Sequence, residues 1–190
     1  MIKTIKQQAI HDNIPIMSDD ALAFVCQLID VHRFYDILEF GTAIGYSSLY
    51  IAHHCPWISI DTIEKDDKRY QKACENKTIL QNTSVSMHHD DAKTWPITKF
   101  YDVVIIDAAK AQNQALFTRV LPFVKERGIV IVDNMSFYGH VHALDAIKHR
   151  RNLRQMVEKI AKFREWLKLQ DHLQTTFIDV GDGLLIIKRK

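Results

Sequence analysis

Acidic and amide side chains follow directly on several apolar runs of this sequence. Asp107 ends the run YDVVIID, Asp133 ends the run GIVIVD, and Asn134 comes next. If these runs are parallel strands, their carboxyl ends meet at one edge of a sheet, and the three side chains lie close together. Their hard oxygens suit Mg²⁺, with water or a substrate completing the octahedron. Lys110, three residues after Asp107, would bring its amine beside that cation and could act as a general base.

A glycine turn separates the first apolar run from the helix that follows it, within residues 37–52. Gly41 and Gly45 bracket the turn, whereas the dinucleotide fingerprint needs three glycines, the middle one admitting a pyrophosphate. Glu39 stands before the turn, where its carboxylate would repel a pyrophosphate but accept from an ammonium or a hydroxyl. Glu64 ends the next apolar run, where a ribose would lie. An ordinary strand-to-helix connection remains an alternative, but the two acids indicate a nucleoside that carries an amino acid, such as S-adenosylmethionine (SAM).

Apolar runs alternate with helical patterns along the chain, which predicts an α/β fold with a mostly parallel sheet and helices on both faces. The expected strands are 37–40, 57–64, 84–89, 101–107, 128–133, 177–180 and 184–188. The expected helices include 3–12, a helix capped by Ser18, 65–78 and 148–169. The last two strands are joined through Gly181-Asp182-Gly183, a signal for an antiparallel hairpin. We therefore expect a Rossmann-like, seven-stranded sheet with an antiparallel C-terminal hairpin.

The composition is that of one globular domain. Of the 190 residues, 47% are hydrophobic and 25% charged, and the net charge is +2. No apolar run approaches the roughly 20 residues of a membrane span, so we expect no membrane association. Cys26, Cys55 and Cys74 lack a paired spacing and indicate free thiols in a reducing compartment. We expect a cytoplasmic single domain over 1–190, with N-terminal helices in 1–33 and the core in 34–190.

Four motifs of the chain together resemble one enzyme family. The segments LEFGTAIGYSS, TIEKD, IIDAAK and IVDN are similar to its cofactor loop, ribose-binding strand end, metal-and-base motif and second metal motif. The family is that of the class I, cation-dependent O-methyltransferases of the catechol and caffeoyl-CoA type. The resemblance extends from about Pro15 to Lys188. It implies a SAM-dependent O-methyltransferase with bound Mg²⁺ or another divalent cation, and we expect a homodimer.

The resemblance also implies roles for individual residues. The implied cofactor-binding residues are Met17, Glu39, Gly41, Ser47, Glu64, Asp91, Ala92 and Asp107. The implied metal ligands are Asp107, Asp133 and Asn134, and the implied catalytic base is Lys110. In that mechanism the cation binds two adjacent oxygens of the acceptor, Lys110 removes a hydroxyl proton, and the oxyanion attacks the methyl group. A side chain added at Gly41 should then occupy the space of the cofactor.

The C-terminal region resembles one branch of that family. The segment RRNLRQMVEKIAKFREWL and the ending VGDGLLIIKRK are similar to bacterial enzymes that methylate 5-hydroxyuridine in the tRNA anticodon loop. Residues 148–168 contain eight Lys and Arg against two Glu, a charge of +6 in a chain of +2. Such a helix face could hold tRNA phosphates while the target base enters the metal site. The resemblance thus implies tRNA as a partner.

Three alternatives stay open from the sequence. The acceptor could be a small hydroxylated aromatic metabolite of the catechol kind. The chain could instead be a non-catalytic protein that binds SAM and RNA, although the intact set of metal and base residues disfavours this. The charges of residues 148–168 could simply belong to a solvated helix face. His140 and His142, which follow the second metal motif, could contact the substrate.

Overall fold

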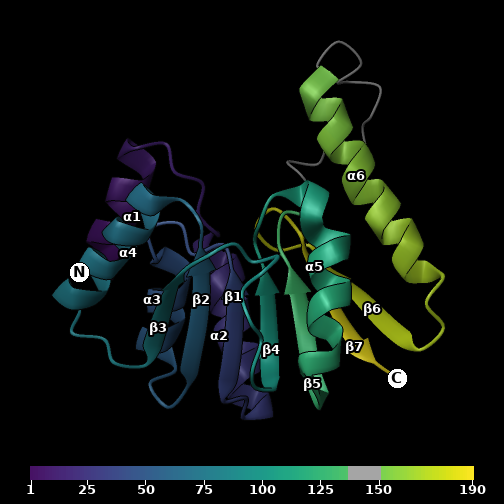
Figure 1. Cartoon of the computed structure of the whole chain (residues 1–190), viewed down its shortest axis with the longest axis horizontal. Coiled ribbons are helices and arrows are strands. Elements are labelled where there is room, and N and C mark those ends of the chain that lie inside the picture. Colours follow the sequence, from purple (N-terminus) through teal and green to yellow (C-terminus); the bar gives the residue numbers. More distant parts are fainter. Residues whose placement is uncertain (137–150) are drawn as a thin grey trace.

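The computed structural model describes residues 1–136 and 151–190, with only the helical backbone described for 151–153. The chain forms one seven-stranded sheet in the order β3-β2-β1-β4-β5-β7-β6 (Figure 1). Its strands are β1 (Asp36–Phe40), β2 (Ser59–Glu64), β3 (Val85–His89), β4 (Tyr101–Ile106), β5 (Val124–Val132), β6 (Leu173–Ile178) and β7 (Leu184–Arg189). β1 to β5 are parallel, and β7 runs antiparallel to both β5 and β6. The predicted fold class is confirmed.

Six α-helices surround the sheet in the described part of the chain (Figure 1). They are α1 (Ile2–His11), α2 (Asp19–His32), α3 (Tyr46–His54), α4 (Asp67–Ile79), α5 (Asn113–Val120) and α6 (Arg151–Lys168), with short 3-10 turns η1 (Lys110–Gln112) and η2 (Leu121–Phe123). The predicted cap of α2 is confirmed, since the Ser18 hydroxyl accepts from the Ala21 amide at 3.2 Å. None of these helices is both long and apolar enough to cross a bilayer.

Two hydrophobic cores lie on the two faces of the sheet. In β4, Val103 and Ile105 enter the core that contains α1, α2 and α3, while Val104 and Ile106 enter the core that contains α5 and α6. This alternation follows from the two-residue period of a strand. Because both faces are covered, the central strands read as continuous apolar runs in the sequence.

Three strands begin two or more residues away from the predicted position. β6 begins at Leu173 rather than at 177, because this edge strand pairs only with β7 and exposes Gln174, Thr175 and Thr176. It therefore lacks the apolar alternation that identifies a strand. β5 begins at Val124, ahead of the charged residues before Gly128, and β2 begins at Ser59 rather than at 57. The start of the predicted helix 148–169 lies outside the described residues before 151.

Candidate active site

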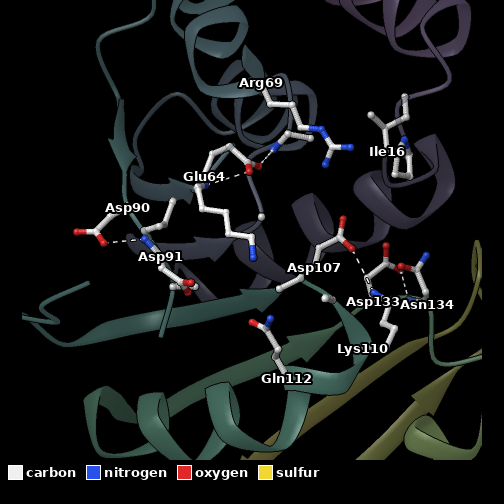
Figure 2. Close-up of a pocket in the computed structure, with 18 of the residues that line it drawn as sticks. Ile16, Glu64, Arg69, Asp90, Asp91, Asp107, Lys110, Gln112, Asp133 and Asn134 are labelled. Carbon is white, nitrogen blue, oxygen red and sulfur yellow. Dashed lines mark hydrogen bonds and ion pairs between the residues drawn. The ribbon is translucent and has the colours of Figure 1, made fainter. Parts of the chain in front are cut away.

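A pocket of about 490 Å³ opens at the carboxyl ends of the parallel strands (Figure 2). Each of the five parallel strands delivers a residue to its lining, as expected for the crevice of an open α/β sheet. These residues are Gly41 after β1, Glu64 at the end of β2, Asp91 after β3, Asp107 after β4 and Asp133 after β5. Ala92, Lys110 and Asn134 also line the pocket, so the structure brings together eight of the predicted site residues.

The glycine turn packs against the end of β4. Gly41 has a φ of +107°, and a side-chain Cβ built there would overlap the backbone carbonyl oxygen of Asp107. A substitution would therefore first push two strand ends apart, rather than simply occupy the space of the cofactor as the sequence suggested. The turn needs glycine both for this close approach and for its backbone conformation.

Glu39 and Ser47 lie behind the glycine turn and are absent from the pocket lining. Glu39 is 1% exposed, and it accepts hydrogen bonds from the hydroxyls of Ser47 and Thr62. Burial raises the pKa of Glu39 to about 7, although these two hydrogen bonds oppose the shift. Strand alternation explains the position, because Glu39 shares a sheet face with Ile37, which belongs to the core on the α3 side.

Met17 is also absent from the pocket lining. It is 2% exposed and packs in the core formed with α1, α2 and α3. The two residues before it, Pro15 and Ile16, line the pocket instead, and Figure 2 shows the position of Ile16. The segment ahead of α2 therefore does reach the pocket, but through neighbours of the residue that the resemblance implied.

Glu64 joins the glycine turn to the end of β2. Its carboxylate accepts from the Ala43 amide at 2.8 Å and from the amides of Lys65 and Asp66 at 3.0 and 2.9 Å. A carboxylate has about four acceptor positions, so one remains for a ribose hydroxyl. The same side chain can thus hold the turn in shape and contact a nucleoside.

The loop after β3 closes the pocket on the side expected for adenine. The Asp91 carboxylate accepts from the Lys93 amide at 2.9 Å, and the Asp91 amide donates to the carboxylate of Asp90 at 2.6 Å. Ala92 follows in the lining. These bonds fix the direction of the loop backbone, which leaves one Asp91 oxygen available to a ligand.

The predicted metal and base residues form one cluster at the ends of β4 and β5 (Figure 2). The Nζ of Lys110 lies 3.3 Å from Oδ1 of Asp107, and the Lys110 side chain is only 8% exposed. Asp133 is 2% exposed. Burial raises the pKa of Asp133 to about 7, and the charge of Asp107 adds to the shift while Lys110 opposes it.

Two crowded carboxylates and an amide suit a divalent cation. Asn134 adopts a φ of +55°, a left-handed conformation that asparagine tolerates. Its backbone amide donates to the Asp133 carboxylate at 2.7 Å, which leaves the side-chain amide oxygen for a ligand. The described residues contain no group of three or more His, Cys, Asp or Glu arranged to hold a metal. A cation here would thus take two acids, one amide oxygen and further oxygens from water or substrate, which is the pattern of Mg²⁺.

Sequence reasoning missed several residues of the lining. Lys65 and Arg69 follow Glu64 closely in the sequence. Because a helix begins just after this strand end, its first residues were candidates for the pocket lining. Gln112 follows Lys110 by two positions, on the 3-10 turn η1. Met156 comes from α6, far away in the sequence, and no local signal points to it.

This fold and this pocket define an α/β enzyme that binds a nucleoside cofactor beside a cluster able to hold a divalent cation. The model of the O-methyltransferase family matches residues 1–190, and the chain belongs to this family. The protein is accordingly a SAM-dependent O-methyltransferase. This confirms the class implied by the sequence motifs and sets aside a non-catalytic binding protein.

Individual relatives agree with this assignment. A Staphylococcus aureus structure, described as a candidate caffeoyl-CoA O-methyltransferase, is 34% identical with a TM-score of 0.93 and covers 100% of this chain and 92% of that one. A Bacillus cereus O-methyltransferase in complex with SAH shares the fold, at 23% identity and a TM-score of 0.82, covering 100% and 90%. Caffeoyl-CoA O-methyltransferase of Populus kitakamiensis is 25% identical over 186 residues, which are 93% of this chain and 78% of the relative.

Proposed function

We propose that this O-methyltransferase methylates the 5-hydroxyl group of 5-hydroxyuridine in the anticodon loop of tRNA, with a divalent cation held by Asp107, Asp133 and Asn134. The observation that carries the tRNA proposal is the position and charge of α6. Its N-terminal half projects beyond the carboxyl ends of β4 and β5 (Figure 1), and its Met156 lines the pocket. A polyanion bound along this helix could therefore deliver a base to the pocket.

The outward face of α6 carries cations that the described part of the protein leaves unpaired. Arg154 pairs with Glu158 and Lys168 with Glu165, each at 2.7 Å. Lys159 and Lys162 are exposed and have no ion-pair partner among the described residues. The inward face is apolar and buried through Val157, Ile160, Phe163 and Leu167. Such free lysines are suited to phosphates, whose counterions they would release on binding.

Several basic and histidine residues that the sequence suggested for tRNA or substrate binding have no described side chain. Lys148, Arg150, His140 and His142 lie outside the described residues, as does the side chain of Arg151. The proposal therefore rests on the charges from Arg154 onward. Substitutions of Lys159 and Lys162 test whether these charges bind tRNA.

The chemistry follows from the positions of the pocket residues. When bound, SAM supplies a methyl group on a sulfonium and the cation supplies a Lewis acid. Lys110, held beside Asp107 and largely shielded from water, is placed to take the proton of the acceptor hydroxyl. Glu64 and the glycine turn orient the cofactor at the other side of the pocket. Two adjacent acceptor oxygens fit this arrangement, and 5-hydroxyuridine offers its 5-hydroxyl and 4-carbonyl.

A small hydroxylated aromatic is the second candidate acceptor, because a catechol also presents two adjacent oxygens. Apolar pocket residues that could contact its ring, among them Ile16, Ala108 and Met156, favour this alternative. The catechol O-methyltransferase of Mycobacterium tuberculosis, 28% identical over 147 residues, is one relative that bears such a name.

We also propose that the protein is a homodimer and that it is located in the cytoplasm. A homodimer is supported by large apolar side chains exposed near the amino ends of β1 and β2, namely Val31, Tyr35 and Trp57. A cytoplasmic location is supported by the three cysteines, all of which are free thiols.

Nucleoside mass spectrometry of tRNA from a strain lacking the gene tests the acceptor. We expect 5-methoxyuridine to disappear and 5-hydroxyuridine to accumulate, with rescue by the wild-type gene but not by Asp133→Ala. Unchanged 5-methoxyuridine would contradict the tRNA proposal. In vitro, Lys159→Gln with Lys162→Gln should lower the slope of log affinity against log salt by about 1.5 to 2. Lys168→Gln, on the same helix but paired with Glu165, is the matched control.

A further inference from the structure

The pocket has cations on the side opposite the metal cluster. Lys65 follows Glu64, and Arg69 lies in the first turn of α4; both line the pocket and both are exposed. Figure 2 shows Arg69 extending above Glu64 in the direction of Ile16, on the far side of the pocket from Lys110. The lining is thus divided, with the acids Asp107 and Asp133 at one end and two cations at the other.

The guanidinium of Arg69 has no partner among the residues that the structure describes. Its backbone amide donates to the Asp66 carboxylate at 2.9 Å, but this bond caps α4 and leaves the side chain free. Three of the roughly four acceptor positions of the nearby Glu64 carboxylate are occupied by backbone amides, and no hydrogen bond joins it to Arg69. In contrast, Lys110 at the other end of the pocket already has Asp107 as its partner. Arg69 therefore offers up to five N–H donors to a ligand.

The position of Arg69 is unfavourable for the helix that carries it. It is the third residue of α4, where the helix dipole is positive and a cation is disfavoured. The helix end, Lys65 and Arg69 together create positive potential at one side of the pocket. Such a combination attracts an anion.

The cofactor SAM carries a carboxylate on its methionine part. The sequence resemblance implied Ser47 as one of the cofactor-binding residues. In the structure the Ser47 hydroxyl donates to Glu39 behind the glycine turn, away from the pocket lining. Lys65 and Arg69 are the pocket cations that have no partner among the described residues, and they are therefore available to bind an oxyanion.

We infer that Arg69, assisted by Lys65, binds an oxyanion of a ligand in this pocket. A guanidinium binds carboxylate and phosphate with the same planar pair of hydrogen bonds. The oxyanion has two sources: the α-carboxylate of SAM, or a phosphate of the acceptor, the latter resting on the proposed tRNA function. Arg69 is a binding residue in either case and takes no part in the methyl transfer itself.

Calorimetry on the full-length protein tests the carboxylate source. The ligands are S-adenosylhomocysteine and 5′-methylthioadenosine, which lacks the carboxylate. The variants are Arg69→Gln and, as control, Lys68→Gln, which changes an exposed cation in the same helical turn that does not line the pocket. Arg69→Gln should weaken S-adenosylhomocysteine about 10- to 100-fold and leave 5′-methylthioadenosine unchanged. Arg69→Lys should restore part of the affinity.

Binding of tRNA tests the phosphate source. If the oxyanion is a phosphate, Arg69→Gln leaves both nucleosides unchanged but lowers the salt slope of tRNA binding by about one. If wild-type protein fails to bind tRNA, the tRNA function fails and the S-adenosylhomocysteine result alone decides. The inference is overturned if Arg69→Gln behaves like Lys68→Gln in both assays. It is also overturned if the variant weakens both nucleosides equally, because the lost contact then involves no oxyanion.

Discussion

Aspartate and lysine residues lie at both ends of the central strands. Among the described residues, only at the amino end does an aspartate have enough hydrogen-bond donors to hold its carboxylate in the charged form. At the amino end, the Asp102 carboxylate accepts from the amides of Tyr35 and Asp36 and from Lys125, all within 2.9 Å. Burial by itself raises the pKa of Asp102, but these bonds outweigh it and hold the pKa below its usual value. The acid is thereby stabilised in its charged form.

At the carboxyl end, Asp133 is more deeply buried, and the charge of another acid, Asp107, raises its pKa further. One lysine, Lys110, serves this cluster, and the pKa of Asp133 is raised to about 7 by burial first. The same residue types thus hold the sheet together at one end and leave a charge to be neutralised at the other. An uncompensated acid cluster in a pocket is the mark of a functional site.

The largest effect should follow from removing an acid at the carboxyl end. Asp133→Ala should lower single-turnover methyl transfer on the order of 10³-fold or more, because the proposed cation would supply several kcal/mol of transition-state stabilisation. Calorimetry should show S-adenosylhomocysteine binding largely retained. The variant should also be at least as stable to heat as the wild type, since a buried charge is removed. A loss of stability with full turnover would contradict this, because Asp133 would then be a structural rather than a functional acid.

Substitution of the proposed base at the same end, Lys110, should give the next largest effect. Lys110→Ala should reduce turnover by about 10²- to 10⁴-fold, the usual range for a general base. Rates measured at higher pH should recover in part, because solvent hydroxide can then take the proton. A pH-independent loss would instead indicate that Lys110 positions Asp107 through the 3.3 Å ion pair.

A buried acid at the carboxyl end of β1, behind the glycine turn and outside the metal cluster, sharpens the comparison. Glu39 has a pKa of about 7 in the folded protein, raised by burial from 4.5. Its contribution to stability is complete below the unfolded value and is lost as pH rises through 7. Glu39→Gln should therefore flatten the fall in unfolding free energy of the wild type between pH 4.5 and 7, by at most about 3 kcal/mol. Parallel pH profiles of the two proteins in urea unfolding would contradict this.

The amino end should show the smallest effect, and only on stability. Asp102→Ala should lower the unfolding free energy by about 2 kcal/mol, because two amides and Lys125 lose their acceptor. Turnover per folded molecule should stay unchanged. Because the pKa of Asp102 is held low, its contribution is complete above the unfolded value of about 4 and is lost as pH falls through the lower pKa of the folded protein. A stability difference between the two proteins that does not shrink as pH falls below about 4 in urea unfolding would refute this assignment.

The sequence predicts the parts of the site that strand ends determine. Asp107 and Asp133 close apolar runs, and parallel strands must bring such ends to one edge, so their proximity follows from topology. Closeness to the glycine turn in the sequence does not by itself place a side chain in the pocket. Glu39 is next to the turn but faces α3, because side chains alternate along a strand. Arg69 and Met156 depend on how α4 and α6 pack over the edge. Neither orientation is encoded locally.

Methyl transfer from labelled SAM, with and without a chelator, tests most directly whether the acid cluster at the carboxyl end holds a catalytic cation. The assay uses wild-type protein, Asp133→Ala and Asp102→Ala, with either tRNA containing 5-hydroxyuridine or a catechol as acceptor. We expect excess chelator to abolish transfer by the wild type and by Asp102→Ala, and added Mg²⁺ to restore both, while Asp133→Ala stays inactive. Full transfer by the wild-type protein in excess chelator would contradict the account.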